Sequence, residues 1–196
     1  MPTAVDRLIH RYVLLNHPFF KTSADDTLKW MPFGLLFLLD LLGTRTRSGW
    51  KRQVLIAGAA ESIKYLISDN LKKVTHEQRP APYTGKHSFP SGHTSTAFST
   101  AEFLHSELKD SLPVLSYSGY AAATTVAVIR IMKNRHWLKD AVVGAAVGII
   151  STKLAYLIVN NISKTRRDRR KSDEEREAEL HNSLSKEPNR SSKTIF

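Results

Sequence analysis

The chain of 196 residues contains no cysteine, so neither disulfide bonds nor thiolate metal ligands can contribute to its fold or chemistry. The N-terminus has no apolar run behind a basic start, and we therefore expect no cleavable secretion signal. A cluster of carboxylates able to hold two metal ions is also missing, which argues against a two-metal hydrolase. The length suits one domain with a sizeable core.

Long hydrophobic runs are scarce on average, with a mean hydropathy of -0.29 and 41% hydrophobic residues. The apolar residues are nevertheless concentrated between about residues 30 and 160. Five segments there have the length of a bilayer span, which is roughly 17 to 25 residues. They are about 26–43, 53–71, 91–107, 114–132 and 139–160. The sequence predicts an all-α, membrane-embedded bundle of about five transmembrane helices, and a helical bundle in water is the alternative.

Positive charge dominates the chain, with a formal net charge of +11. This charge favours an anionic partner, such as nucleic acid, a membrane surface or a phosphorylated substrate. Basic residues gather at 45–52, after the first apolar segment, and at 164–171, after the last one. Five spans put both stretches on one side, which the positive-inside rule makes the cytosol. The connections at 72–90 and 133–138 then face the outside.

The two ends of the chain differ from the apolar region. Residues 5–20 are amphipathic and predict a short helix that lies along the outer membrane interface. From about residue 163 the sequence alternates basic and acidic residues and cannot bury enough apolar area to fold alone. We therefore expect a membrane domain at 1–162 and a disordered cytosolic tail at 163–196.

The two outer connections concentrate residues that suit phosphate. The first holds Lys72 and Arg79, whose charge and planar fork match phosphate oxygens. It leads into Pro90-Ser91-Gly92-His93, where a helix is expected to begin. Backbone N–H groups at the start of a helix form an anion-binding cradle, and Gly92 leaves that approach open. The second connection begins near Arg130, a third cation.

Two histidines beside these cations indicate covalent chemistry. His136 and Asp140 are four residues apart and would share one face at a helix start. The carboxylate could keep one imidazole nitrogen protonated and leave the other free to attack. His93 could then protonate the departing oxygen. The pattern predicts metal-free phosphoryl transfer through a phosphohistidine.

Taken in order, these residues resemble the three-part signature of the type 2 phosphatidic acid phosphatase superfamily. Lys72 with Arg79-Pro80 matches K-x6-R-P, the segment 90–93 matches P-S-G-H, and Arg130 with His136 and Asp140 matches S-R-x5-H-x3-D. Each piece alone is weak, whereas all three in order with every spacing kept are specific. The resemblance spans about residues 5–160. The superfamily includes bacterial lipid phosphatases, non-specific acid phosphatases and vanadium haloperoxidases.

The resemblance implies a role for each matched residue. The phosphate-binding residues would be Lys72, Arg79, Ser91, Gly92 and Arg130. His136 would be the nucleophile, Asp140 its orienting partner and His93 the general acid. Ile129 replaces the serine of the family pattern, so one hydrogen bond to phosphate is lost or supplied by another group.

The function expected from the resemblance is removal of phosphate from a membrane lipid, with no metal, no cofactor and no nucleic acid. The site would face the periplasm of a bacterial inner membrane. Candidate substrates are isoprenyl pyrophosphate carriers, phosphatidylglycerophosphate and phosphorylated lipid A, which the sequence does not rank. One alternative is a vanadate-dependent haloperoxidase-like enzyme, which the small size disfavours. Another is a non-catalytic membrane adaptor with a lipid-binding tail, which the intact His–Asp pair disfavours. The sequence does not indicate the oligomeric state.

Overall fold

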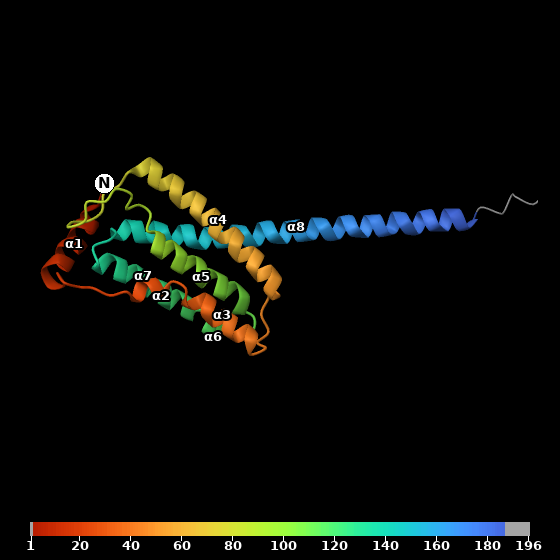
Figure 1. Ribbon diagram of the computed structural model, residues 1–196, viewed down its shortest axis with the longest axis horizontal. Coiled ribbons are helices and arrows are strands. Elements are labelled where there is room, and N and C mark those ends of the chain that lie inside the picture. The colour runs from red at the N-terminus through yellow and green to blue at the C-terminus, as the bar shows by residue number, and fades with distance from the viewer. Residues whose placement is uncertain (1, 187–196) are drawn as a thin grey trace, which may run out of the picture. The chain divides into compact units, whose positions relative to one another are not determined.

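The computed structural model describes residues 2–186, which form eight α-helices and no β-strand (Figure 1). The helices are α1 (Ala4–Asn16), α2 (Ala24–Leu28), α3 (Met31–Leu41), α4 (Trp50–Thr75), α5 (Gly92–Leu108), α6 (Pro113–Ser116), α7 (Ser118–Met132) and α8 (Leu138–Lys186). The expected all-α fold is therefore confirmed. The chain divides into two compact units, Met1–Tyr156 and Leu157–Phe196.

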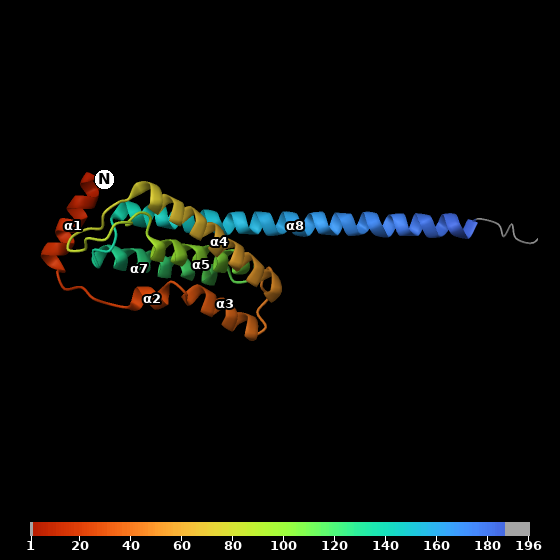
Figure 2. The same ribbon diagram turned by 45° about the horizontal axis from the view of Figure 1, so that its top comes forward.

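Helix α5 is the central element of the first unit, packed against α2, α3, α4, α6 and α7 (Figures 1 and 2). Small side chains form its contact with α7, where Ala97 and Ala101 meet Ala123 and Val126. Because alanine leaves little side chain between two helices, their backbones come close together. The third predicted segment, 91–107, therefore corresponds to a helix that contacts other helices on several sides.

Helix α8 touches α5 through glycine. A Cβ atom added at Gly144 would lie 2.7 Å from the backbone oxygen of Ser91, and one at Gly148 would lie 2.3 Å from that of Ser95. Both distances are shorter than any real carbon–oxygen contact, so only glycine fits. This seam, defined by Gly144 and Gly148 against the first turns of α5, brings the start of α5 against the start of α8.

An ion pair lies inside the bundle. Lys64 of α4 contacts Glu61 one turn earlier, and its ammonium donates to the Thr96 hydroxyl of α5 at 2.7 Å. A charge away from water is costly unless it is paired and hydrogen-bonded, and this one is both.

Membrane crossing is supported for part of the chain. Two stretches, Pro113–Met132 and Leu138–Ser183, are long and apolar enough to span a bilayer, and α3 is apolar but shorter. The five segments expected from the sequence all fall on helices, although the first is divided between α2 and α3 and the fourth between α6 and α7. The number of crossings remains a prediction.

The described part of the expected tail, residues 163–186, is helical, whereas the sequence predicts disorder there. Helix α8 continues to Lys186, and residues 163–183 are almost all exposed. Arg170 and Glu174 form an ion pair at 2.8 Å with the i,i+4 spacing that stabilises helices. Alternating Arg, Lys and Glu are good helix formers, which explains the difference. The unit begins at Leu157 rather than at 163, and residues 187–196 of the expected tail lie outside the described residues.

Candidate active site

The predicted site residues come together at one end of the first unit. Helix α4 ends there at Thr75, α5 begins at Gly92, α7 ends at Met132 and α8 begins at Leu138 (Figures 1 and 2). The segments 76–91 and 133–137 connect these helices at that end. All eight residues singled out by the sequence lie in these connections or in the helical turns next to them.

The start of α5 is built as expected for a cradle, with one difference. The ammonium of Lys72 would lie 3.7 Å from a Cβ atom at Gly92, so this cation sits directly against the start of the helix. The Ser91 side chain is fully buried, and its hydroxyl accepts hydrogen bonds from the backbone N–H and the hydroxyl of Thr94. Ser91 therefore caps its own helix, and its N–H donates to the carbonyl of Asp140 at 3.0 Å.

Two arginines add positive charge that is only partly compensated. Arg130 donates to the carboxylate of Asp25 at 2.8 Å, but its Nε is buried and has no hydrogen-bond partner among the described residues. Arg79 donates to the carbonyl of Arg135 at 3.3 Å. Burial lowers the pKa of Arg79, and the charges of Arg130 and Arg135 lower it further. Crowded guanidinium groups with a buried unmet donor suit an anion.

The imidazole of His136 is only 4% exposed and is held by an unexpected residue. Its Nδ1 donates to the main-chain carbonyl of Ser88 at 2.8 Å, whereas the nearest carboxylate oxygen of Asp140 is 3.7 Å away, too far for a hydrogen bond. Asp140 instead accepts from the Ser88 hydroxyl at 2.5 Å and from the N–H of Trp137 at 3.0 Å. The expected direct Asp140–His136 hydrogen bond is thus replaced by a contact through Ser88.

This arrangement determines which nitrogen of His136 is reactive. A carbonyl can only accept a hydrogen bond, so Nδ1 carries the proton and Nε2 keeps its lone pair. Burial lowers the pKa of His136, and the charges of Arg130 and Arg79 act in the same direction against the effect of Asp140. The imidazole is therefore kept neutral, the form that can attack phosphorus.

The second imidazole, His93, lies in the first turn of α5 and faces α2. Its Nε2 is 2.8 Å from a carboxylate oxygen of Asp26 and 3.2 Å from the ammonium of Lys29. The charge of Arg130 acts on both His93 and His136. Arg130 therefore lies near both histidines, and we refer to Lys72, Arg79 and Arg130 together with these two imidazoles as the cationic pocket.

Sequence reasoning missed two acidic neighbours of this pocket. Asp25 is fully buried and pairs with Arg130 and with Lys133, the latter at 2.9 Å. Asp26 contacts His93. The only signal in the sequence is a pair of adjacent aspartates before an apolar segment, and that pattern alone does not indicate contact with residues about a hundred positions later.

Asp25, Asp26 and His93 form the one group of described side chains whose ligand atoms lie close enough together to hold a metal ion. One ligand atom each from Asp25, Asp26 and His93 lies within 4.8 Å of the other two. Asp25, however, already faces the cations Arg130 and Lys133. A divalent ion would have to displace these charges or lie beside them, so the donor set fits an ion-pair network better than a metal site.

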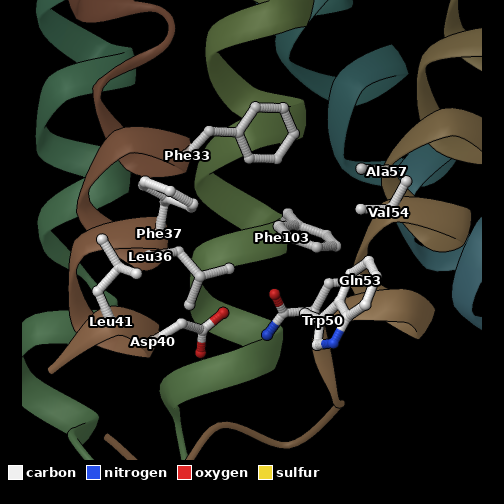
Figure 3. Close-up of a pocket in the computed structure, with 10 residues that line it drawn as sticks. All are labelled: Phe33, Leu36, Phe37, Asp40, Leu41, Trp50, Gln53, Val54, Ala57 and Phe103. Carbon is white, nitrogen blue, oxygen red and sulfur yellow. The ribbon is translucent and has the colours of Figure 1, made fainter. Parts of the chain in front are cut away.

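An apolar cavity of about 480 Å³ lies elsewhere, between α3, α4 and α5 (Figure 3). It is lined by Phe33, Leu36, Phe37, Asp40, Leu41, Trp50, Gln53, Val54, Ala57 and Phe103, none of which is basic. Its nearest residue on α4 to the site, Ala57, is separated from Lys72 by roughly 22 Å of helix at 1.5 Å per residue. This cavity does not belong to the cationic pocket.

Comparison with known proteins places the chain among relatives of one kind. Residues 53–164 match the family model of the PAP2 superfamily. A stretch of 139 residues is 32% identical to "Lipid A 1-phosphatase" of Porphyromonas gingivalis. The match covers 71% of this chain but 31% of that protein, so the chain spans about a third of the relative's length.

Two solved structures share the fold. The crystal structure of Aquifex aeolicus LpxE has a TM-score of 0.59 at 21% identity and covers 79% of this chain and 96% of that one. The other is described as the first transmembrane PAP2 type phosphatidylglycerolphosphate phosphatase from Bacillus subtilis. Its TM-score is 0.51 at 18% identity, over 81% of this chain and 86% of that one.

Proposed function

Because the chain belongs to the PAP2 superfamily, as its three-part signature predicts, we propose that it is a membrane-bound lipid phosphatase that works through a phosphohistidine. The observation that carries the proposal is a buried imidazole, bound through Nδ1 to a main-chain carbonyl, beside a cationic pocket with an unmet guanidinium donor. His136 supplies the nucleophile. Lys72, Arg79 and Arg130 supply the pocket.

In the first step Nε2 of His136 attacks phosphorus in line with the ester bond. The P–N bond forms while the P–O bond to the lipid breaks, and His93 gives its proton to the departing oxygen. Lys72, Arg79 and Arg130 stabilise the charge spread over the equatorial oxygens. The products of this step are the dephosphorylated lipid and a phosphohistidine.

In the second step water hydrolyses the phosphohistidine. His93, now neutral, takes a proton from the attacking water, and the P–N bond breaks to release inorganic phosphate. The Ser88 carbonyl keeps Nδ1 of His136 protonated, so the lone pair returns to Nε2. No step requires a metal ion, since the three cations provide the positive charge.

We propose that the five predicted segments cross a membrane, with the site on the outer side and the tail from residue 163 in the cytosol. Large apolar side chains on several helices are exposed, among them Phe37, Leu55, Leu66 and Val142. Exposed apolar surface on so many faces suits lipid rather than water. The basic stretch 45–52 runs from the connection after α3 into the first turn of α4, at the end of α4 opposite to Lys72, which agrees with the positive-inside rule.

For the substrate, we favour the phosphate of a lipid A precursor over the other candidates. The support is the name of the relative with 32% identity, "Lipid A 1-phosphatase". Phosphatidylglycerophosphate and isoprenyl pyrophosphate are the substrates to compare. Bromination of a halide acceptor in the presence of vanadate would instead indicate a haloperoxidase-like enzyme, and absence of phosphate release from any lipid would indicate an adaptor.

The decisive variant is His136→Ala. We expect it to fold and to lose activity by about a thousandfold or more, because no other group can form the covalent intermediate. Phosphate release from each lipid is measured with the full chain in detergent, and rapid quenching with radiolabelled substrate traps the phosphoenzyme. His181→Ala, at an exposed position on α8, is the matched control. A folded His136→Ala protein with normal turnover would refute the mechanism.

A further inference from the structure

Helix α2 brings a carboxylate onto the imidazole proposed as the general acid. Asp26 lies 2.8 Å from Nε2 of His93, and Lys29 of the same short segment lies 3.2 Å from that nitrogen and 3.3 Å from Asp26. Resting on the proposed phosphatase function, we propose that Asp26 is a positioning residue that keeps His93 protonated for transfer to the leaving group, and that Lys29 opposes it.

Asp26 is not needed to hold α2 in place. Its side chain is 58% exposed, whereas its neighbour Asp25 is fully buried and forms ion pairs with Arg130 and Lys133. The carbonyl of Lys29 is a second anchor, because it accepts a hydrogen bond from the Thr100 hydroxyl of α5 at 2.8 Å. An exposed carboxylate on a helix that is already anchored contributes little to stability, so its contact with the imidazole points to a role in the reaction.

The surroundings of His93 explain why a carboxylate is required there. The charged groups that act on it are Arg130 on α7, Lys29 beside α2, and Asp26. Two of these three are cations, which favour the neutral imidazole, as does partial burial. Asp26 is the group that favours the charged, proton-donating form.

The two histidines of the pocket differ in the group that contacts the imidazole directly. His136 donates to a main-chain carbonyl, with its nearest carboxylate at 3.7 Å, and the arrangement favours a neutral nucleophile. His93 has a carboxylate in direct contact, which favours a proton donor. Different surroundings for paired titratable groups are a general way of separating acid from base.

Comparing two leaving groups distinguishes a role of Asp26 in proton donation from a purely structural role. An alkoxide leaves poorly without a proton, whereas a nitrophenolate leaves as the anion. Two probes with the same alkyl chain are compared, a long-chain alkyl phosphate and an alkyl-substituted nitrophenyl phosphate. For Asp26→Asn we expect kcat/KM at pH 8 to fall about tenfold with the alkyl phosphate and less than about twofold with the nitrophenyl phosphate.

The pH profile supplies a second readout. With the alkyl phosphate, Asp26→Asn should move the alkaline limb of kcat/KM to lower pH, because His93 loses the group that retains its proton. Lys29→Met should move the same limb to higher pH, because a cation beside the imidazole is removed. Asp110→Asn, an exposed acidic position in the turn after α5, should change neither limb nor leaving-group dependence.

Equal losses on both probes, or an alkaline limb that does not move in Asp26→Asn, would overturn the role of Asp26 even if the phosphatase function stands. The proposed function fails separately, and this inference with it, if His136→Ala releases phosphate from the alkyl phosphate as fast as the unaltered chain. Melting temperatures of all variants in detergent verify that they fold.

Discussion

The reactive imidazole of His136 is oriented by a main-chain carbonyl, that of Ser88. Asp140 does not bind the imidazole itself; its carboxylate accepts hydrogen bonds from the Ser88 hydroxyl and the Trp137 N–H. The carboxylate thus fixes the segment that carries the carbonyl, and the carbonyl fixes the ring.

The pKa of His136 predicts the acidic side of the activity profile. Burial, reinforced by Arg130 and Arg79, lowers this pKa below its ordinary value of 6.5. Protonated imidazole cannot attack, so activity should be lost as the pH falls through the lowered pKa and should be complete above it. We expect the acidic midpoint of kcat/KM, corrected for ionisation of the substrate, to lie below 6.5. A midpoint above 6.5 would contradict the assignment of His136 as the buried nucleophile.

At this scale the sequence predicts residues whose types and spacings the chemistry dictates. Lysine, arginine and histidine at set intervals identify the pocket because few side chains bind and attack phosphate. By contrast, no set spacing to the motif residues identifies Ser88, Asp25 and Asp26. Ser88 meets its partners 48 and 52 positions later, and Asp25 meets Arg130 105 positions later. Only the folded chain brings them together.

Among the elements, the seam between α5 and α8 fixes the cradle relative to the nucleophile. A Cβ atom at Gly148 would lie 2.3 Å from the Ser95 carbonyl and 2.8 Å from the Ser99 N–H, both of them backbone atoms of α5. Neither can move without shifting the whole helix. The start of α5 would shift with it, including the Ser91 N–H that donates to Asp140.

We therefore expect Gly148→Ala to lower the free energy of unfolding by about 1–3 kcal/mol, the usual cost of overpacking, and to reduce kcat. Gly58→Ala is the control, since a Cβ atom there meets nothing within 4 Å. That variant should be unchanged or more stable by up to about 1 kcal/mol, because alanine is the better helix former. Thermal unfolding in detergent gives the comparison, and equal effects of the two substitutions would contradict the close helix contact.

The positions of the helices are predicted better than their ends. Hydropathy averages over a window, so it identifies each apolar segment but merges α2 with α3. The break between them at residues 29–30 coincides with a carbonyl, that of Lys29, taken by the Thr100 hydroxyl of α5. A contact across 71 positions leaves no trace in a local average.

For the molecule as a whole, the chemistry should be independent of metal ions. Positive charge from Lys72, Arg79 and Arg130 takes the part that divalent ions play in other phosphatases. We expect full activity in excess EDTA and inhibition by vanadate, which mimics the five-coordinate transition state. Phosphate release from a lipid substrate measures both. Activity that EDTA removes and Mg²⁺ restores would contradict this, and would direct attention to Asp25, Asp26 and His93.

The half of the pocket next to the seam between α5 and α8 is rigid, whereas the half that contains Arg79 can vary. His136, Asp140 and the start of α5 are tied by backbone contacts that tolerate almost no substitution. Arg79 instead rises from the segment 76–91, whose residues 81–87 are exposed. Diversification toward new headgroups should therefore accumulate in that segment while the glycine-lined seam stays constant, so a chimaera that exchanges 76–87 alone is the economical route to altered selectivity.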